Sequence, residues 1–185
     1  MVALIAFGLI FMPMNAQAGE KFGMKKQIEV GGTIGFTSIT PVFAGTTGNA
    51  TSLFSINPYV GYFITDGFEL GLVPMVTIIS PPSPATSTTD LTIFLAPAYN
   101  FQLQNSTVTP FIEGLIGFSS VSSSGNSASG LSFGGRGGIK VNVTGQALLN
   151  VDVRYLLITE KPSGANDRFG YNELGINVGF TVWFN

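Results

Sequence analysis

The sequence predicts an all-β fold, an eight-stranded antiparallel up-and-down barrel whose outer surface meets lipid. The first observation is composition: charged residues make up 10% of the 185 residues, whereas a soluble domain carries about 25%. The second is a set of eight runs in which every second residue is apolar, the period of a strand with two different faces. The third is the alternation of short and long connections between these runs, which is typical of transmembrane barrels.

The chain begins with an expected signal peptide over residues 1–18. Residues 2–12 are apolar, and Ala16-Gln17-Ala18 places small residues where signal peptidase cleaves. This apolar stretch is too short to cross a bilayer as a helix, which needs about 20 residues. No later segment reaches 18 uninterrupted apolar residues, so we expect residues 19–185 to form a barrel domain that crosses the membrane with strands.

The eight expected strands follow one another along the rest of the chain. They cover residues 28–36, 54–62, 68–78, 91–103, 109–118, 131–143, 149–157 and 173–184. Short turns are expected at Thr65-Asp66-Gly67, around Gln104-Asn105 and at Thr144-Gly145-Gln146. In the first of them, Gly67 supplies the left-handed conformation that a tight hairpin needs. Long connections, rich in Ser, Thr, Gly and Pro, are expected over residues 38–50, 80–90, 119–130 and 159–170. Short turns predict the periplasmic end of the barrel, and long loops predict the extracellular end.

Prolines inside four of the expected strands are the feature that fits this fold least well. Proline lacks the backbone N–H that a closed ladder uses. We therefore expect bulges at these positions, which are Pro58, Pro74, Pro97 and Pro110.

The charged residues of the strands all fall on one phase of the alternation, and the apolar residues define the other. The charged set comprises Glu29, Glu69, Glu113, Arg136, Lys140, Asp152, Arg154 and Glu173. Because a Lys or Arg facing lipid at mid-bilayer costs about 2–4 kcal/mol, the charged phase must face the lumen. Aromatic residues of the apolar phase gather toward the strand ends, as interfacial girdles do. They are Phe36, Phe54, Phe118, Phe133 and Tyr155 near the loops, and Tyr62, Phe68, Tyr99, Phe101 and Phe184 near the turns.

The lumen charges are expected to neutralise one another, because an unpaired buried charge is costly whereas a paired one is tolerated. The strand order predicts three pairs: Arg154 with Glu173, Lys140 with Asp152 across a diagonal, and Arg136 with Glu113. Together with Glu29, these residues form a predicted structural network of ion pairs. Large residues of the same phase, namely Tyr59, Phe94, Phe111 and Trp183, are expected to fill the remaining lumen.

Composition also argues against several classes of function. The chain has no histidine and no cysteine, so neither a Ser-His pair nor a thiolate site can exist, and we expect no catalysis, cofactor or metal. A carboxylate pair of Glu113 with Glu29 or Glu173 could act without histidine, but neutralised lumen charges explain these residues better. The net charge of −2 offers no basic stripe for nucleic acid. The glycines at 134, 135, 137 and 138 lack the Lys and Ser/Thr that end a phosphate-binding loop.

Several short motifs occur in an order and spacing that resembles the small outer-membrane β-barrel family, the OmpA/OmpX-like "porin family". They are Asn57-Pro58-Tyr59-Val60-Gly61-Tyr62-Phe63, Glu69-Leu70-Gly71, Pro110-Phe111-Ile112-Glu113-Gly114, Gly137-Gly138-Ile139-Lys140 and Asp152-Val153-Arg154-Tyr155. The resemblance covers nearly all of residues 19–185 and implies residence in the outer membrane, in contact with its lipid. The last strand, with Trp183-Phe184, is similar to the signal that the family's assembly machinery reads.

These observations predict an integral outer-membrane barrel with a filled lumen and a structural or surface-interaction role. Long loops such as Ser80-Pro81-Pro82-Ser83-Pro84 are candidate contacts for a ligand at the cell surface. Two alternatives stay open on the sequence alone. One is a narrow or gated porin for small solutes. The other is a soluble calyx-type barrel, which would turn its apolar face inward around a ligand.

Overall fold

The computed structural model describes residues 21–43, 46–47, 51–79, 88–104, 106–123, 126–162 and 167–185. The expected signal peptide, residues 1–18, lies outside these ranges. The strands are β1 (Ile28–Phe43), β2 (Thr46–Thr47), β3 (Thr51–Thr65), β4 (Phe68–Ile79), β5 (Thr88–Asn100), β6 (Val108–Ser123), β7 (Asn126–Thr144), β8 (Ala147–Pro162) and β9 (Phe169–Phe184). The described residues contain no helix that is long and apolar enough to cross a membrane.

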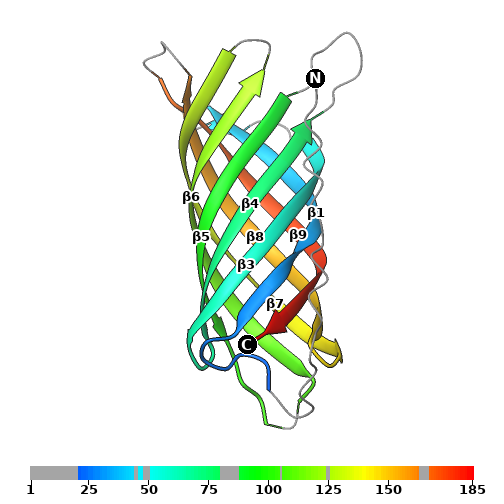
Figure 1. Cartoon of the computed structure of the whole chain (residues 1–185). Helices are drawn as coiled ribbons and strands as arrows, with labels where there is room; N and C mark the ends of the chain where they lie inside the picture. The colour runs from blue at the N-terminus through cyan, green and yellow to red at the C-terminus, as the bar shows by residue number, and fades with distance from the viewer. Residues whose placement is uncertain are drawn as a thin grey trace, which may run out of the picture.

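The strands form one antiparallel sheet that closes on itself. Consecutive long strands pair with each other, and β1 pairs both with β3 and with β9, so the first and last strands complete a tilted cylinder (Figure 1). The two-residue β2 only extends the end of β1, where Val42 lies opposite Thr47. Eight long strands therefore build the barrel, as the sequence predicts. Closure leaves no unpaired edge for the membrane to meet.

The two ends of the barrel differ in their connections. The end that carries the C-terminus and residues 21–27 holds the short turns between β3 and β4 and between β7 and β8. We call it the turn end and the opposite end the loop end. In the first of these turns Gly67 adopts a φ of 77°, a left-handed conformation that favours glycine.

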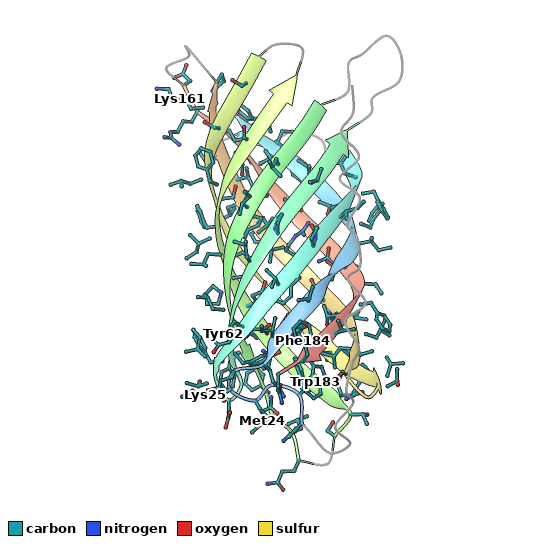
Figure 2. All side chains as sticks on the ribbon, in the orientation of Figure 1. Met24, Lys25, Tyr62, Lys161, Trp183 and Phe184 are labelled. Atoms are coloured by element: carbon teal, nitrogen blue, oxygen red, sulfur yellow. The ribbon has the colours of Figure 1, made fainter. Side chains whose placement is uncertain are left out.

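Side chains alternate between the outside and the lumen along each strand, as the period of two requires. In the middle of β6, Ile116 is 63% exposed, whereas Leu115 beside it is 2% exposed. The outer surface carries the apolar phase (Figure 2), so the calyx alternative, which needs that phase inside, does not fit. The aromatic residues expected in the girdles all lie on this outer phase, with Tyr62 and Phe184 near the turn end.

The strands at the loop end are longer than the sequence predicts. A connection was expected over residues 119–130, but β6 and β7 stay paired as far as Ser123 and Asn126, which lie opposite each other. Similarly, β8 continues to Pro162, past the expected strand end at Leu157. Ser and Gly are poor strand formers on their own, but a partner ladder that is already in register outweighs that local preference. The expected loop over residues 80–84 lies outside the described residues.

The expectation of bulges at the four prolines is wrong. Pro97 and Pro110 lie opposite Leu70 and Ile139 in continuous register. Between β3 and β4, the ladder resumes beyond Pro58 and Pro74 without a shift, since Ile56 still pairs with Val76 and Val60 with Leu72. Each proline thus leaves one ladder hydrogen bond unmade, but no extra residue is inserted and the strand register does not change. Register shifts occur instead beside two turns, at Phe63/Thr65 and at Asn142/Thr144.

Candidate functional site in the barrel lumen

The lumen is closed at the turn end by an apolar plug. Four residues form it: Phe22, Phe63, Leu148 and Trp183, each at most 5% exposed. The ring of Phe22 meets Phe63 edge-on at a centroid distance of 5.3 Å and lies 6.2 Å from Trp183. Such edge-to-face contacts stabilise aromatic clusters beyond the burial of their area.

Residues 21–27, which precede β1, hold this plug in place. The Gln27 side chain accepts hydrogen bonds from the backbone N–H groups of Gly23 and Met24, at 2.8 and 2.9 Å. Its amide nitrogen donates to the carbonyl oxygen of Lys21 at 2.9 Å. The N–H of Lys25 donates to Asp66 in the β3–β4 turn at 2.8 Å. The alternation that predicts strands begins only at residue 28, and it says nothing about a segment that folds across the mouth of the barrel.

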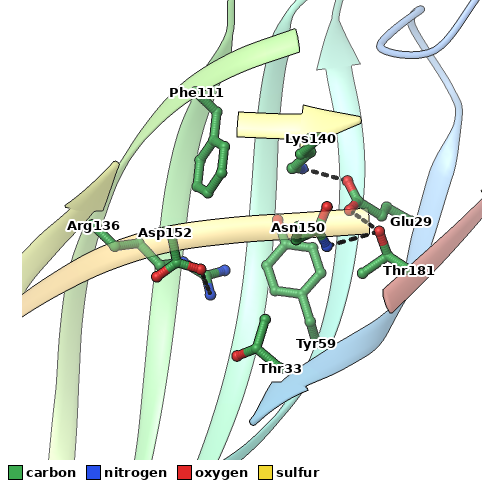
Figure 3. Close-up of a pocket in the computed structure, with 9 residues that line it drawn as sticks. All are labelled: Glu29, Thr33, Tyr59, Phe111, Arg136, Lys140, Asn150, Asp152 and Thr181. Carbon is green, nitrogen blue, oxygen red and sulfur yellow. Dashed lines mark hydrogen bonds and ion pairs between the residues drawn. The ribbon is translucent and has the colours of Figure 1, made fainter. Parts of the chain in front are cut away.

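A charged cluster on the loop-end side of the plug is centred on Lys140. Its Nζ lies 2.5 Å from Glu29 Oε2 (Figure 3). It also lies 3.2 Å from Glu69 Oε2, and all three side chains are at most 5% exposed. The hydroxyl of Thr181 donates to the other oxygen of Glu29 at 2.6 Å. The predicted pair of Lys140 with Asp152 is therefore wrong. The long side chain of Lys140 on β7 instead reaches across the lumen to carboxylates on β1 and β4.

Arg136 forms the next ion pair, with the partner that the sequence predicts. Its Nε donates to Glu113 Oε1 at 2.6 Å and its Nη2 donates to Oε2 at 3.0 Å, a bidentate arrangement between residues directly opposite on β6 and β7. Asp152 lies 3.8 Å from Arg136 Nη1 and accepts a hydrogen bond of 2.6 Å from Asn177. The guanidinium also lies 5.3 Å from the centroid of the Tyr59 ring, within cation–π range.

Arg154 and Glu173 form a third ion pair farther from the turn end, again between predicted partners. The guanidinium also donates to two neutral groups, Asn57 Oδ1 at 3.1 Å and Thr37 Oγ1 at 3.3 Å, whereas its Nε has no hydrogen-bond partner. The structure thus brings together Arg136 with Glu113 and Arg154 with Glu173. Glu69 joins the network through Lys140, although the sequence assigned it no partner.

An apolar belt fills the lumen toward the loop end. It consists of Tyr59, Val73, Met75, Phe94, Ala96, Leu115, Leu156, Ile158 and Tyr171. The four large residues expected to fill the lumen, Tyr59, Phe94, Phe111 and Trp183, are all buried, which confirms that expectation. The belt residues come from β3, β4, β5, β6, β8 and β9, so they close the space between the charged clusters and the loop end.

A second set of acidic residues lies at the loop end and was not predicted. Asp90 is 4% exposed and Glu160 is 0% exposed, although both were placed in long connections. Asp90 accepts hydrogen bonds from Tyr171 and, at 3.4 Å, from Thr92. Extending the strand alternation would have identified them. Asp90 lies an even number of residues from Phe94, and Glu160 an even number from Arg154, so each faces the same side as a lumen residue of its own strand.

The free volume among the charged residues of the lumen is small. The cavity among the charged residues measures about 10 Å³, room for about one water molecule. A larger hollow of about 260 Å³ lies at the turn end, beside Phe22 and Leu148. Among the described residues, no group of three or more carboxylates is placed to hold a metal ion.

A closed barrel that is apolar outside and ionised inside is a transmembrane β-barrel. The chain belongs to the outer membrane protein beta-barrel domain family, whose model matches residues 3–181. The protein therefore resides in the outer membrane. No curated protein matches the chain.

Solved structures share this fold at low sequence identity. Neisserial surface protein A is 19% identical with a TM-score of 0.64, covering 84% of this chain and 96% of its own. OprG from Pseudomonas aeruginosa is 16% identical with a TM-score of 0.61, covering 89% and 100%. The outer membrane protein AlkL, solved in DMPC lipid bilayers, is 11% identical with a TM-score of 0.62, covering 94% and 97%. At these identities the likeness shows the fold alone.

Proposed function

We propose that this outer-membrane barrel is closed and non-enzymatic, with a structural or surface-interaction role and its turn end toward the periplasm. In this proposal, residues 1–18 are a signal peptide and the lumen ion pairs stabilise the barrel. The observation that supports it best is the filling of the lumen at three successive levels. These are the plug around Phe22 and Trp183, the charged clusters around Lys140 and Arg136, and the apolar belt around Phe94.

The lumen charges favour a structural role over a catalytic one. The carboxylates of Glu29, Glu113 and Glu173 each accept from a basic side chain at hydrogen-bond distance. A carboxylate held in this way is poorly placed to act as a base toward a substrate. Nor does the 10 Å³ cavity beside these groups admit a substrate. The chain also lacks the histidine that usually activates a hydroxyl nucleophile.

Two partners belong to the proposal. The assembly machinery would read the C-terminal strand, in which Trp183 points into the plug and Phe184 lies on the lipid phase. A ligand at the cell surface would contact the loops. Among the described residues, those beside the loops include the exposed Lys161, Asp167 and Arg168.

Planar-bilayer recording tests whether the lumen is closed. Refolded protein is added to a bilayer, and insertion is checked in parallel vesicles by the change of gel mobility on heating. We expect no conductance steps beyond those of the protein-free bilayer. Reproducible steps from the wild-type chain would overturn the closed lumen and select the narrow porin instead.

A plug variant makes this test sharper. Phe22→Ala removes a central ring of the turn-end plug but leaves the apolar belt intact, so we expect the bilayer to stay silent. If this single change produced conductance, the belt would not block the lumen, and the plug alone would act as a gate.

A further inference from the structure

Two carboxylates at the loop end of the lumen lack a basic partner among the described residues. They belong to Asp90 on β5 and Glu160 on β8, and both side chains are buried. Both oxygens of Glu160 are shielded from solvent, and neither has a hydrogen-bond partner. An isolated buried carboxylate is costly unless a cation or a proton accompanies it.

The basic side chains of the lumen are committed to other carboxylates. Lys140 is held by Glu29 and Glu69, Arg136 by Glu113, and Arg154 by Glu173. The described strands thus place seven carboxylates in the lumen against three basic side chains. The apolar belt separates Lys140 and Arg136 from the loop end. Asp90 and Glu160 are therefore left without a basic side chain at ion-pair distance among the described residues, so a bound cation or a proton would have to offset their charge.

Oxygen atoms surround this position. The Tyr171 hydroxyl on β9 donates to one oxygen of Asp90, and Thr92 donates to the other at 3.4 Å. The Thr92 hydroxyl oxygen also lies 3.1 Å from the hydroxyl of Ser119. Asp90 also lies close enough to Glu160 for the two carboxylates to interact electrostatically. On β7, the residue opposite Glu160 is Gly130, which has no side chain to add to the lumen at this level.

This set of donors selects a class of ligand. Carboxylate and hydroxyl oxygens suit hard cations such as Ca²⁺, which takes six to eight oxygen ligands in flexible geometry. Zinc and copper favour the nitrogen and sulfur ligands of histidine and cysteine, and the chain contains neither residue. Two carboxylates without a third predict weak binding, with water completing the coordination.

We propose that Asp90 and Glu160 bind a hard divalent cation, with Ca²⁺ as the model ion, at the loop end of the lumen. Tyr171 and Thr92 hold the Asp90 carboxylate in position. The belt residues Phe94 and Leu156 close the lumen below, so the ion enters and leaves through the loop end and does not cross the barrel. A bound ion would connect β5 to β8 across the lumen and so stabilise the loop end.

Terbium luminescence tests the site directly, because Tb³⁺ replaces Ca²⁺ at oxygen sites and the Tyr171 phenol can sensitise its emission. Protein refolded in detergent is titrated with TbCl₃ under tyrosine excitation. We expect saturable emission that CaCl₂ displaces. Glu160→Gln and Asp90→Asn should each weaken Tb³⁺ binding by at least about tenfold. Both changes keep the size of the side chain and remove a buried charge, so folding is preserved.

Asp167→Asn is the matched control. It removes an exposed carboxylate at the same end of the barrel and should leave the titration unchanged. A second measurement is the melting temperature, which CaCl₂ should raise in the wild type and in Asp167→Asn but not in Glu160→Gln. The proposal is overturned if Tb³⁺ emission does not saturate, or if it survives both Glu160→Gln and Asp90→Asn. It is also overturned if Glu160→Gln raises the melting temperature without metal while wild-type protein binds no Tb³⁺, which would mean that the pair carries a proton instead.

Discussion

Replacing Lys140 by methionine should destabilise the barrel more than any other single loss of charge in the lumen. The ammonium lies 2.5 Å from Glu29 and 3.2 Å from Glu69, and both carboxylates are fully buried. Methionine keeps most of the volume but removes the charge. The change would leave two carboxylates facing each other without a cation between them.

The magnitude follows from the contacts that are lost. Each charge-assisted hydrogen bond contributes about 1.5–3 kcal/mol, and breaking a buried ion pair by removing one partner costs about 3–5 kcal/mol. Glu29 keeps the hydrogen bond from Thr181, and Glu69 keeps the hydrogen bond from Asn100 at 3.0 Å. Both carboxylates therefore remain partly stabilised by polar neighbours. We therefore expect a loss of about 4 kcal/mol in the free energy of unfolding. That corresponds to close to a thousandfold in the folding equilibrium, at about 1.4 kcal/mol for each factor of ten.

Urea titration in lipid vesicles measures this loss, with the folded fraction read from the gel mobility of unheated samples. Lys25→Met is the matched control, because the Lys25 side chain is exposed and its structural contact is through the backbone N–H. The triple variant Lys140→Met, Glu29→Gln, Glu69→Gln should recover most of the stability, since it leaves no orphaned charge. A loss in Lys140→Met no greater than that in Lys25→Met would refute the assigned role of this network.

Three further substitutions probe other parts of the barrel by the same titration. Glu173→Ala should lower the free energy of unfolding by about 3 kcal/mol, because Arg154 keeps only neutral hydrogen-bond partners. Gly71→Ala should cost about 1–3 kcal/mol, because a Cβ there would lie 2.8 Å from the Tyr59 ring and must displace it. Ile116→Lys should cost about 2–4 kcal/mol in vesicles, because it places a charge on the lipid face halfway along β6.

Each of these substitutions has a control that separates its cause from a general effect. Asp167→Ala removes an exposed carboxylate, and equal losses in it and in Glu173→Ala would count against the buried pair. A Cβ at Gly114 meets only the Pro97 ring, at 3.8 Å, so Gly114→Ala should be nearly neutral. A similar cost at both glycines would exclude crowding of Tyr59. Thr144→Lys, at an exposed turn, should change stability little; if Ile116→Lys is as mild, lipid does not cover that face.

Much of the fold was predictable because a strand has only two faces. A period of two fixes the side on which each residue lies, and lipid allows the charged side to be only the lumen. That constraint correctly placed Glu29, Lys140 and Arg154 inside and Ile116 outside. The strand ends were less predictable, because at the loop end pairing to a neighbouring strand outweighs the weak preferences of Ser and Gly.

The sequence by itself determined the eight strands, the closed barrel and, within the expected strands, which side chains face the lumen. Only the tertiary structure decided which lumen residues meet. Arg136 and Glu113 lie opposite each other on adjacent strands, so aligning two consecutive strands was enough to predict their pairing. Lys140 and Tyr171 instead reach across the lumen, to Glu29 and to Asp90 on strands that are not their neighbours. Such contacts depend on the tilt and stagger of the closed barrel, which bring distant strands to one level, and alternation along a single strand carries no information about them.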